Sequence, residues 1–77
     1  MSSQQLTAQR VAGALRAEMA RQRKTGLDLA RLLNCSQSSA SRRMVGEKSL
    51  DLDELGLVAE WLDVPLTTLL GATDKAA

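Results

Sequence analysis

Apolar side chains recur along the first part of the chain at the spacing of one helix face. Val11, Leu15 and Met19 follow one another at intervals of four residues, with small alanines beside them. Because an α-helix repeats every 3.6 residues, these side chains line up in one stripe. The other positions hold mostly Ala, Arg, Gln and Glu, which tolerate or favour helices. The pattern predicts a long helix over about residues 3–23.

A short second helix is predicted over residues 26–33, followed by a turn. Thr25 can cap its first turn, and Asp28 stands three residues later, where it can complete a capping box. Asn34 is the residue type that, after Gly, most easily takes the left-handed conformation that closes a helix. Cys35, within the turn, is expected to be a small buried apolar side chain.

The third predicted helix, residues 37–45, is mostly polar, and Ser36 is its expected N-cap. At 100° per residue, Ala40 and Met44 point toward the core, whereas Arg42 and several serines lie on the opposite side. An exposed face of small hydroxyls and an arginine can simply be solvated. It also suits contact with base edges in a DNA groove.

Two further helices are predicted in the second half of the chain. Asp51, with Glu54 three residues on, predicts a capping box for a helix over about residues 52–62. Pro65 favours the start of a short last helix, which Gly71 closes. The sequence therefore predicts an all-α, compact five-helix fold.

A length of 77 residues fits a single domain, residues 1–77, whose last six residues, 72–77, are expected to fray. Fourteen leucines supply much of the apolar content, and Phe and Tyr are absent. No stretch approaches the roughly 18 consecutive apolar residues of a membrane span, and no secretory pattern opens the chain. We expect a soluble, cytoplasmic protein without a membrane partner.

The residue types that are missing argue against several chemistries. The chain has no His, so it lacks an imidazole base and a His metal ligand, and its single Cys cannot form an intramolecular disulfide or a thiolate zinc site. Neither of the two common glycine-rich phosphate-binding motifs occurs. We expect no enzymatic activity, no cofactor and no bound metal.

Charge is distributed unevenly along the chain. Residues 1–48 contain nine Lys or Arg side chains and three acids, which gives a net charge of +6. Residues 49–77 contain one Lys and six acids, which gives a net charge of −5. Such asymmetry is typical of a protein with one part that faces a polyanion. Two solvated faces would give the same composition.

The informative unit is residues 25–46, two short helices joined by a short turn. This is a helix-turn-helix, whose second helix can enter a DNA major groove. Motif positions occur in this unit and continue into the fourth and fifth predicted helices: Thr25, Leu29, Ala30, Leu33, Asn34, Cys35, Ser36, Ala40, Ser41, Arg42, Arg43, Met44, Gly46, Leu52, Leu55, Val58, Ala59, Leu62, Val64, Pro65, Leu69 and Leu70. Over about residues 6–70, the chain resembles the helix-turn-helix domain of the phage Cro and lambda-type repressor superfamily, in its bacterial and prophage regulator branch.

Three positions depart from that resemblance. Gly26 stands where many members carry a Gln that bonds a phosphate and braces the second helix, so this support is expected to be missing. Asn34 replaces the usual turn Gly, which is physically acceptable. Trp61 replaces a usually small residue, and it either packs at the edge of the core or lies in a subunit contact.

The resemblance implies a DNA-binding surface centred on the third helix. Its candidate base-reading residues are Gln37, Ser38, Ser41 and Arg42. Its candidate contacts to the DNA backbone are Lys24, Thr25, Ser36, Ser39, Arg43 and Lys48. For Arg43 the alternative is an intramolecular pair with Glu47 or Asp51, and for the two lysines it is solvation.

The resemblance also implies pairing through the last helix, because members of the superfamily commonly dimerise there. The candidate interface residues are Trp61, Leu66, Leu69 and Leu70. The alternative for the three leucines is that they only close the core of the monomer. Acidic residues in this half would stay away from the DNA.

Together these features predict a sequence-specific, double-stranded-DNA-binding transcriptional regulator of bacterial cytoplasm, located at the nucleoid when bound. The resemblance favours a phage or prophage Cro-like or immunity-type repressor that binds palindromic half-sites as a homodimer and occludes a promoter. One alternative is the DNA-binding antitoxin of a toxin–antitoxin module. Another is a helical protein-interaction module that does not bind DNA.

Overall fold

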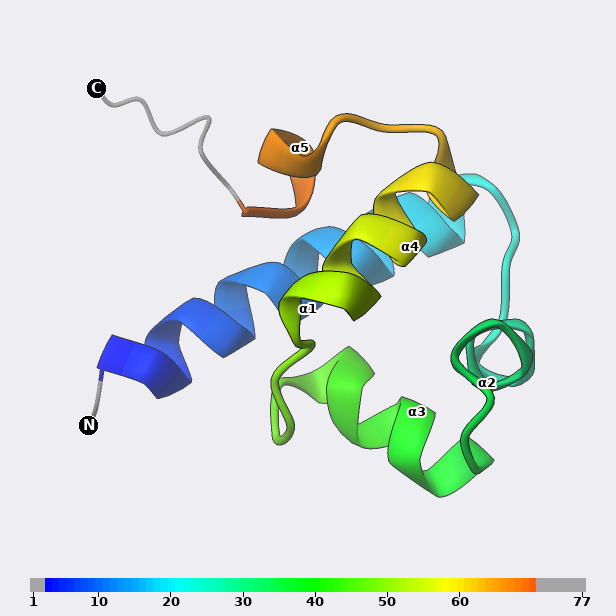
Figure 1. Ribbon diagram of the computed structural model, residues 1–77, viewed down its shortest axis with the longest axis horizontal. Helices are drawn as coiled ribbons and strands as arrows, with labels where there is room; N and C mark the ends of the chain where they lie inside the picture. The colour runs from blue at the N-terminus through cyan, green and yellow to red at the C-terminus, as the bar shows by residue number, and fades with distance from the viewer. Residues whose placement is uncertain (1–2, 71–77) are drawn as a thin grey trace.

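The computed structural model describes residues 3–70 and contains five α-helices and no strand within them (Figure 1). The helices are α1 (Ser3–Arg21), α2 (Gly26–Leu33), α3 (Gln37–Val45), α4 (Leu52–Leu62) and α5 (Leu66–Leu70). The expected all-α, five-helix fold is confirmed. The expected closure by Gly71 and the expected fraying of residues 72–77 lie outside the described residues.

A single core joins the helices. The stripe on α1, which includes Leu15 and Met19, is buried as predicted, and α3 and α5 both pack against α1. The other extensive contacts are between α2 and α3 and between α4 and α5. The buried apolar side chains are Val11, Ala12, Leu15, Met19, Leu29, Ala30, Ala40, Leu55, Val58, Ala59, Leu62 and Leu69.

The starts of the three middle helices are fixed by capping side chains, as the sequence predicts. The Thr25 hydroxyl accepts from the Asp28 N–H (3.2 Å), and the Asp28 carboxylate accepts from the Thr25 N–H (2.8 Å). Asp51 begins α4 with an equivalent capping box, and Ser36 caps α3. These bonds satisfy backbone N–H groups that lack partners within the first helical turn.

Three helices end at a non-glycine residue in the left-handed conformation. Asn34 takes it after α2 (φ 55°), as expected, but Arg23 (φ 60°) and Asp63 (φ 57°) also take it after α1 and α4. At Arg23, the next N–H donates back to the Met19 carbonyl (2.8 Å), which closes the helix. For this reason α1 ends at Arg21, two residues earlier than the apolar and charge pattern predicts.

Gly46 ends α3 where the chain turns against α1. Its φ is 86°, which L side chains rarely adopt, and an added Cβ would lie 3.0 Å from the Gln9 Cα. The Glu47 N–H donates to the Arg42 carbonyl (2.9 Å) and completes the turn. Glycine is therefore required here both by the backbone conformation and by the close approach of α1.

Candidate nucleic-acid interface

The outer face of α3 carries the four side chains predicted to read bases. Ala40 is fully buried and Met44 is half-buried against the core, so the inner face of the helix is the predicted one. The opposite face is open to solvent. The predicted base-reading residues on it are all exposed: Gln37, Ser38, Ser41 and Arg42. The structure therefore brings amide, hydroxyl and guanidinium groups together on the exposed face of one helix.

The hydroxyls of Thr25 and Ser36 lie at the starts of the two helices of the helix-turn-helix. Both are exposed and both are already used as caps, since the Ser36 Oγ accepts from the Ser39 N–H (3.0 Å). The Thr25 hydroxyl also donates to Asp28 Oδ2 (3.0 Å). Hydrogen bonds from the Thr25 backbone and hydroxyl, in that order of importance, lower the pKa of Asp28. The start of α2 thus holds a carboxylate, which opposes a phosphate at that end.

Lys24 contacts an aromatic ring rather than being fully solvated. Its Nζ lies 4.8 Å from the centre of the Trp61 ring, a cation–π geometry. Trp61 itself is half-buried and packs against the core from α4. The indole therefore lies at the core edge, which is one of the two alternatives expected for it, and holds the lysine near the end of α1.

Arg43 is the position where the structure corrects the prediction. Its side chain is buried and pairs with Glu54 of α4 (Nη2 to Oε2, 3.0 Å), not with Glu47 or Asp51. It also donates to the Ser39 hydroxyl and carbonyl. Burial removes the guanidinium from water, so it requires a charged partner. The buried Arg43 is therefore not an open phosphate contact, and the hydroxyl of the half-buried Ser39 already accepts a hydrogen bond from it.

Lys48 is exposed in the loop after α3, and no partner for its ammonium is found among the described side chains of residues 7–70. It lies two residues beyond Gly46, close to the end of the candidate recognition helix. Its backbone N–H donates to the Arg42 carbonyl (3.3 Å), which fixes the loop to α3. This arrangement leaves a positively charged, exposed side chain in the loop that follows α3, as a phosphate contact requires.

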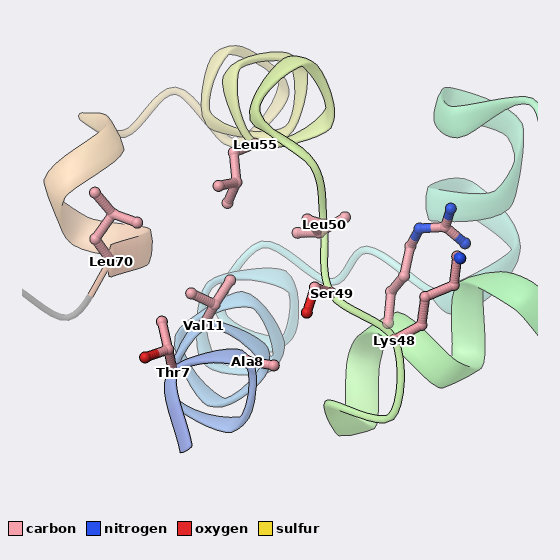
Figure 2. A pocket seen from close by; sticks show the side chains of 9 residues that line it. Thr7, Ala8, Val11, Lys48, Ser49, Leu50, Leu55 and Leu70 are labelled. Carbon is pink, nitrogen blue, oxygen red and sulfur yellow. The ribbon is translucent and has the colours of Figure 1, made fainter. Parts of the chain in front are cut away.

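Lys48 also borders a cavity of about 410 Å³ between α1, α4 and α5. Figure 2 shows Val11, Leu55 and Leu70 facing this space from the three helices, with Leu50 of the loop on another side. The half-exposed Leu70 therefore lies over a hollow of the monomer rather than on a flat outer face.

The other predicted interface leucines differ in burial. Leu66 is 40% exposed, whereas Leu69 has no exposed surface. Leu69 therefore belongs to the core, the alternative expected for it, because α5 turns this side chain toward α1. Of the three predicted leucines, Leu66 and Leu70 keep surface for a second chain.

Two long-range contacts were not predictable from the pattern. The Arg16 guanidinium of α1 donates to the Met44 carbonyl near the end of α3, and the Gln22 side chain donates to the Leu62 carbonyl (2.7 Å). Both bonds satisfy carbonyls near helix ends. Their donors and acceptors lie far apart in sequence, and no local signal links them.

The geometry defines a class: a helix-turn-helix with an exposed polar face on its second helix, within a small all-helical domain, as in DNA-binding regulators. The chain matches the family of the BetR domain over residues 2–77, and it belongs to that family. No curated protein and no solved structure matches it significantly. The match does not name the phage Cro and lambda-type superfamily, so that finer resemblance stays a prediction. None of the helices in residues 3–70 has the length and apolar character needed to cross a membrane.

Proposed function

We propose that this chain is a sequence-specific double-stranded-DNA-binding transcriptional regulator that uses α3 as its recognition helix. The observation that carries the proposal is the orientation of α3. Its apolar residue Ala40 is buried while Gln37, Ser38, Ser41 and Arg42 face solvent together. These side chains can form hydrogen bonds with base edges: Gln with adenine, Arg with guanine and Ser with either.

The distribution of charge supports the same orientation. The helix-turn-helix lies in the half of the sequence with a net charge of +6, and the acids of α4, such as Asp53 and Glu60, are exposed on another helix. A positively charged surface releases counterions when it binds phosphates, so affinity falls steeply as salt rises. Membership of the BetR domain family adds support for a DNA-binding regulator.

We further propose repression by occlusion. Two copies would place their α3 helices in successive major grooves, about 34 Å apart, on palindromic half-sites in a promoter. Leu66 and Leu70 offer the apolar surface for pairing. We also propose that the chain is of phage or prophage origin, as the resemblance implies, and that it has no enzymatic activity.

The test is selection of bound duplexes from a random-sequence pool by the purified full chain, followed by titration of the recovered duplex at several salt concentrations. We expect an enriched, two-fold symmetric site and an affinity that falls linearly with salt on logarithmic axes. Failure to enrich any sequence, with no salt-dependent shift of a labelled duplex, would favour the protein-interaction module. Co-purification of a small toxic partner would favour the antitoxin.

Lys48→Ala tests the proposed division between phosphate contacts and base readers. Because Lys48 is exposed beside α3, its loss should weaken the recovered duplex and a random duplex to the same extent. The logarithmic salt slope should fall by about 1. Titration of both duplexes measures this, and a loss confined to the recovered duplex would contradict the phosphate role.

A further inference from the structure

The candidate recognition helix has little apolar surface with which to hold its orientation. Within α3, Ala40 is the one apolar side chain that is buried, and Met44 is only half-buried. Such a narrow apolar stripe permits rotation of a helix about its own axis more easily than a wide one does. The angle at which α3 presents its outer face must therefore be set by additional contacts.

An ion pair between α3 and α4 supplies such a contact. The Arg43 guanidinium meets both oxygens of the Glu54 carboxylate, Nη2 to Oε2 at 3.0 Å and Nε to Oε1 at 3.4 Å. Its third nitrogen donates to the Ser39 carbonyl (3.2 Å) and hydroxyl, one turn back on α3. The arginine thus joins two turns of the recognition helix to one carboxylate.

Glu54 is itself held in place. Its Oε1 accepts from the Asp51 N–H (3.1 Å), and its own N–H donates to Asp51 Oδ1 (2.7 Å). These bonds form the capping box of α4, so the carboxylate cannot follow Arg43 without disturbing the start of that helix. The ion pair therefore links α3 to a fixed point.

We propose that Arg43 and Glu54 are positioning residues, which set the rotation of α3 and hence the direction in which Arg42 and the other base readers point. The inference rests on the proposed function and deepens it by assigning specificity to a pair that does not touch DNA. A two-point arginine–carboxylate contact restricts orientation, whereas apolar side chains of similar volume supply stability with less directional control.

Two substitutions and their combination test the pair. Arg43→Met keeps much of the buried volume, and Glu54→Gln keeps the capping box because Gln also serves at that position. Each single variant should lower the ratio of affinities for the recovered and random duplexes by about tenfold, with an unchanged salt slope. In the double variant, this affinity ratio should fall no further than in either single variant, because both substitutions remove the same contact.

A phosphate contact by Arg43 would give the opposite result. Arg43→Met would then weaken binding to both duplexes alike, and the slope of log affinity against log salt concentration would fall by about 0.9. The loss of affinity caused by Arg43→Met would also be the same with Glu or Gln at position 54. Lys48→Met is the matched comparison, since it removes one positive charge nearby from a side chain that is exposed. It should give this phosphate pattern, and the same pattern from Arg43→Met would overturn the proposal.

Amide hydrogen exchange of the free protein tests the pair without DNA. Each single variant should speed exchange in the last turns of α3 about fivefold more than in the centre of α1, because only α3 loses its restraint. An equal change in both helices would indicate a purely global loss of stability and would overturn the inference. A wild-type chain that binds no duplex, with exchange still faster only in α3, would overturn the proposed function alone.

Discussion

Arg42 and Arg43 are neighbours with the same chemistry and opposite surroundings. Arg42 is exposed on the outer face of α3, whereas Arg43 is buried and paired with Glu54. A difference of 100° around the helix separates them. We therefore propose that Arg42 contacts DNA and that Arg43 orients the helix.

Replacing Arg42 with Ala tests the first assignment. The variant should bind the recovered duplex about 1–3 kcal/mol more weakly and accept any base at one position in each half-site. Titration against a panel of single-base variants measures both effects. Arg31→Ala, a loss of the same charge from the exposed face of α2, is the control and should leave base preference unchanged. Unaltered binding of every duplex by Arg42→Ala would contradict its role as a base reader.

Asp28 should make stability depend on pH at the start of α2. Hydrogen bonds from the Thr25 backbone and hydroxyl lower its pKa below the ordinary value of 3.8 in the folded state. A lowered pKa stabilises the fold above that ordinary value, and this contribution disappears as the pH falls through the folded-state pKa. Urea unfolding from pH 7 down to about pH 2 should therefore show a smaller loss of stability for Asp28→Asn than for the wild type.

The control is Asp53→Asn, which removes an exposed acid of the same type from α4. Its unfolding free energy should follow the wild-type pH dependence more closely than that of Asp28→Asn. Identical curves for Asp28→Asn and the wild type would show that the Thr25–Asp28 capping box contributes nothing through charge.

At the scale of helices, starts were predictable from sequence and ends were less so. Thr25, Ser36 and Asp51 are capping types whose hydrogen bonds reach only three residues, so local sequence suffices. Arg23 and Asp63 adopt the left-handed conformation without the Gly or Asn that signals it. No residue type near Arg23 indicated that α1 would end early.

Contacts between helices were not predictable because they depend on how the elements pack. The pattern of Ala40 and Met44 gave the outer face of α3 correctly, since it needs only helical periodicity. The partner of Arg43 lies 11 residues away and that of Arg16 lies 28 residues away. Glu47 and Asp51 were reasonable partners by proximity, but α4 brings Glu54 to the guanidinium instead.

Gly46, which ends α3, and Gly56, within α4, should respond in opposite ways to substitution by alanine. Gly56 is an exposed residue in the middle of α4, and nothing lies within 4 Å of an added Cβ. Gly56→Ala should therefore stabilise the fold by about 0.5–1 kcal/mol. Gly46→Ala should destabilise it by more than about 1 kcal/mol, because φ is 86° and Gln9 is close. Urea unfolding measures both changes. A destabilising Gly56→Ala would contradict the open space found around this residue.

At the scale of the whole molecule, α5 divides its leucines between the core and the surface. Leu69→Ala should destabilise the monomer by about 2–5 kcal/mol because it leaves a cavity in the core. Leu66→Ser, at a half-exposed site, should change the unfolding free energy far less while it weakens joint binding to two half-sites. Analytical ultracentrifugation with a two-half-site duplex measures the second effect. Unchanged two-copy binding by Leu66→Ser would remove Leu66 from the proposed interface.

The folded chain presents the polar face of α3 on one side and the acids of α4 elsewhere, and the proposed function depends on which of these surfaces meets DNA. Backbone amide chemical shifts of the full chain, recorded during titration with the recovered duplex, test this most directly. We expect the largest changes in residues 37–42 and 46–48, with small changes on the exposed face of α4. Changes concentrated on α4 around Trp61, or no changes with any duplex, would contradict the proposed function.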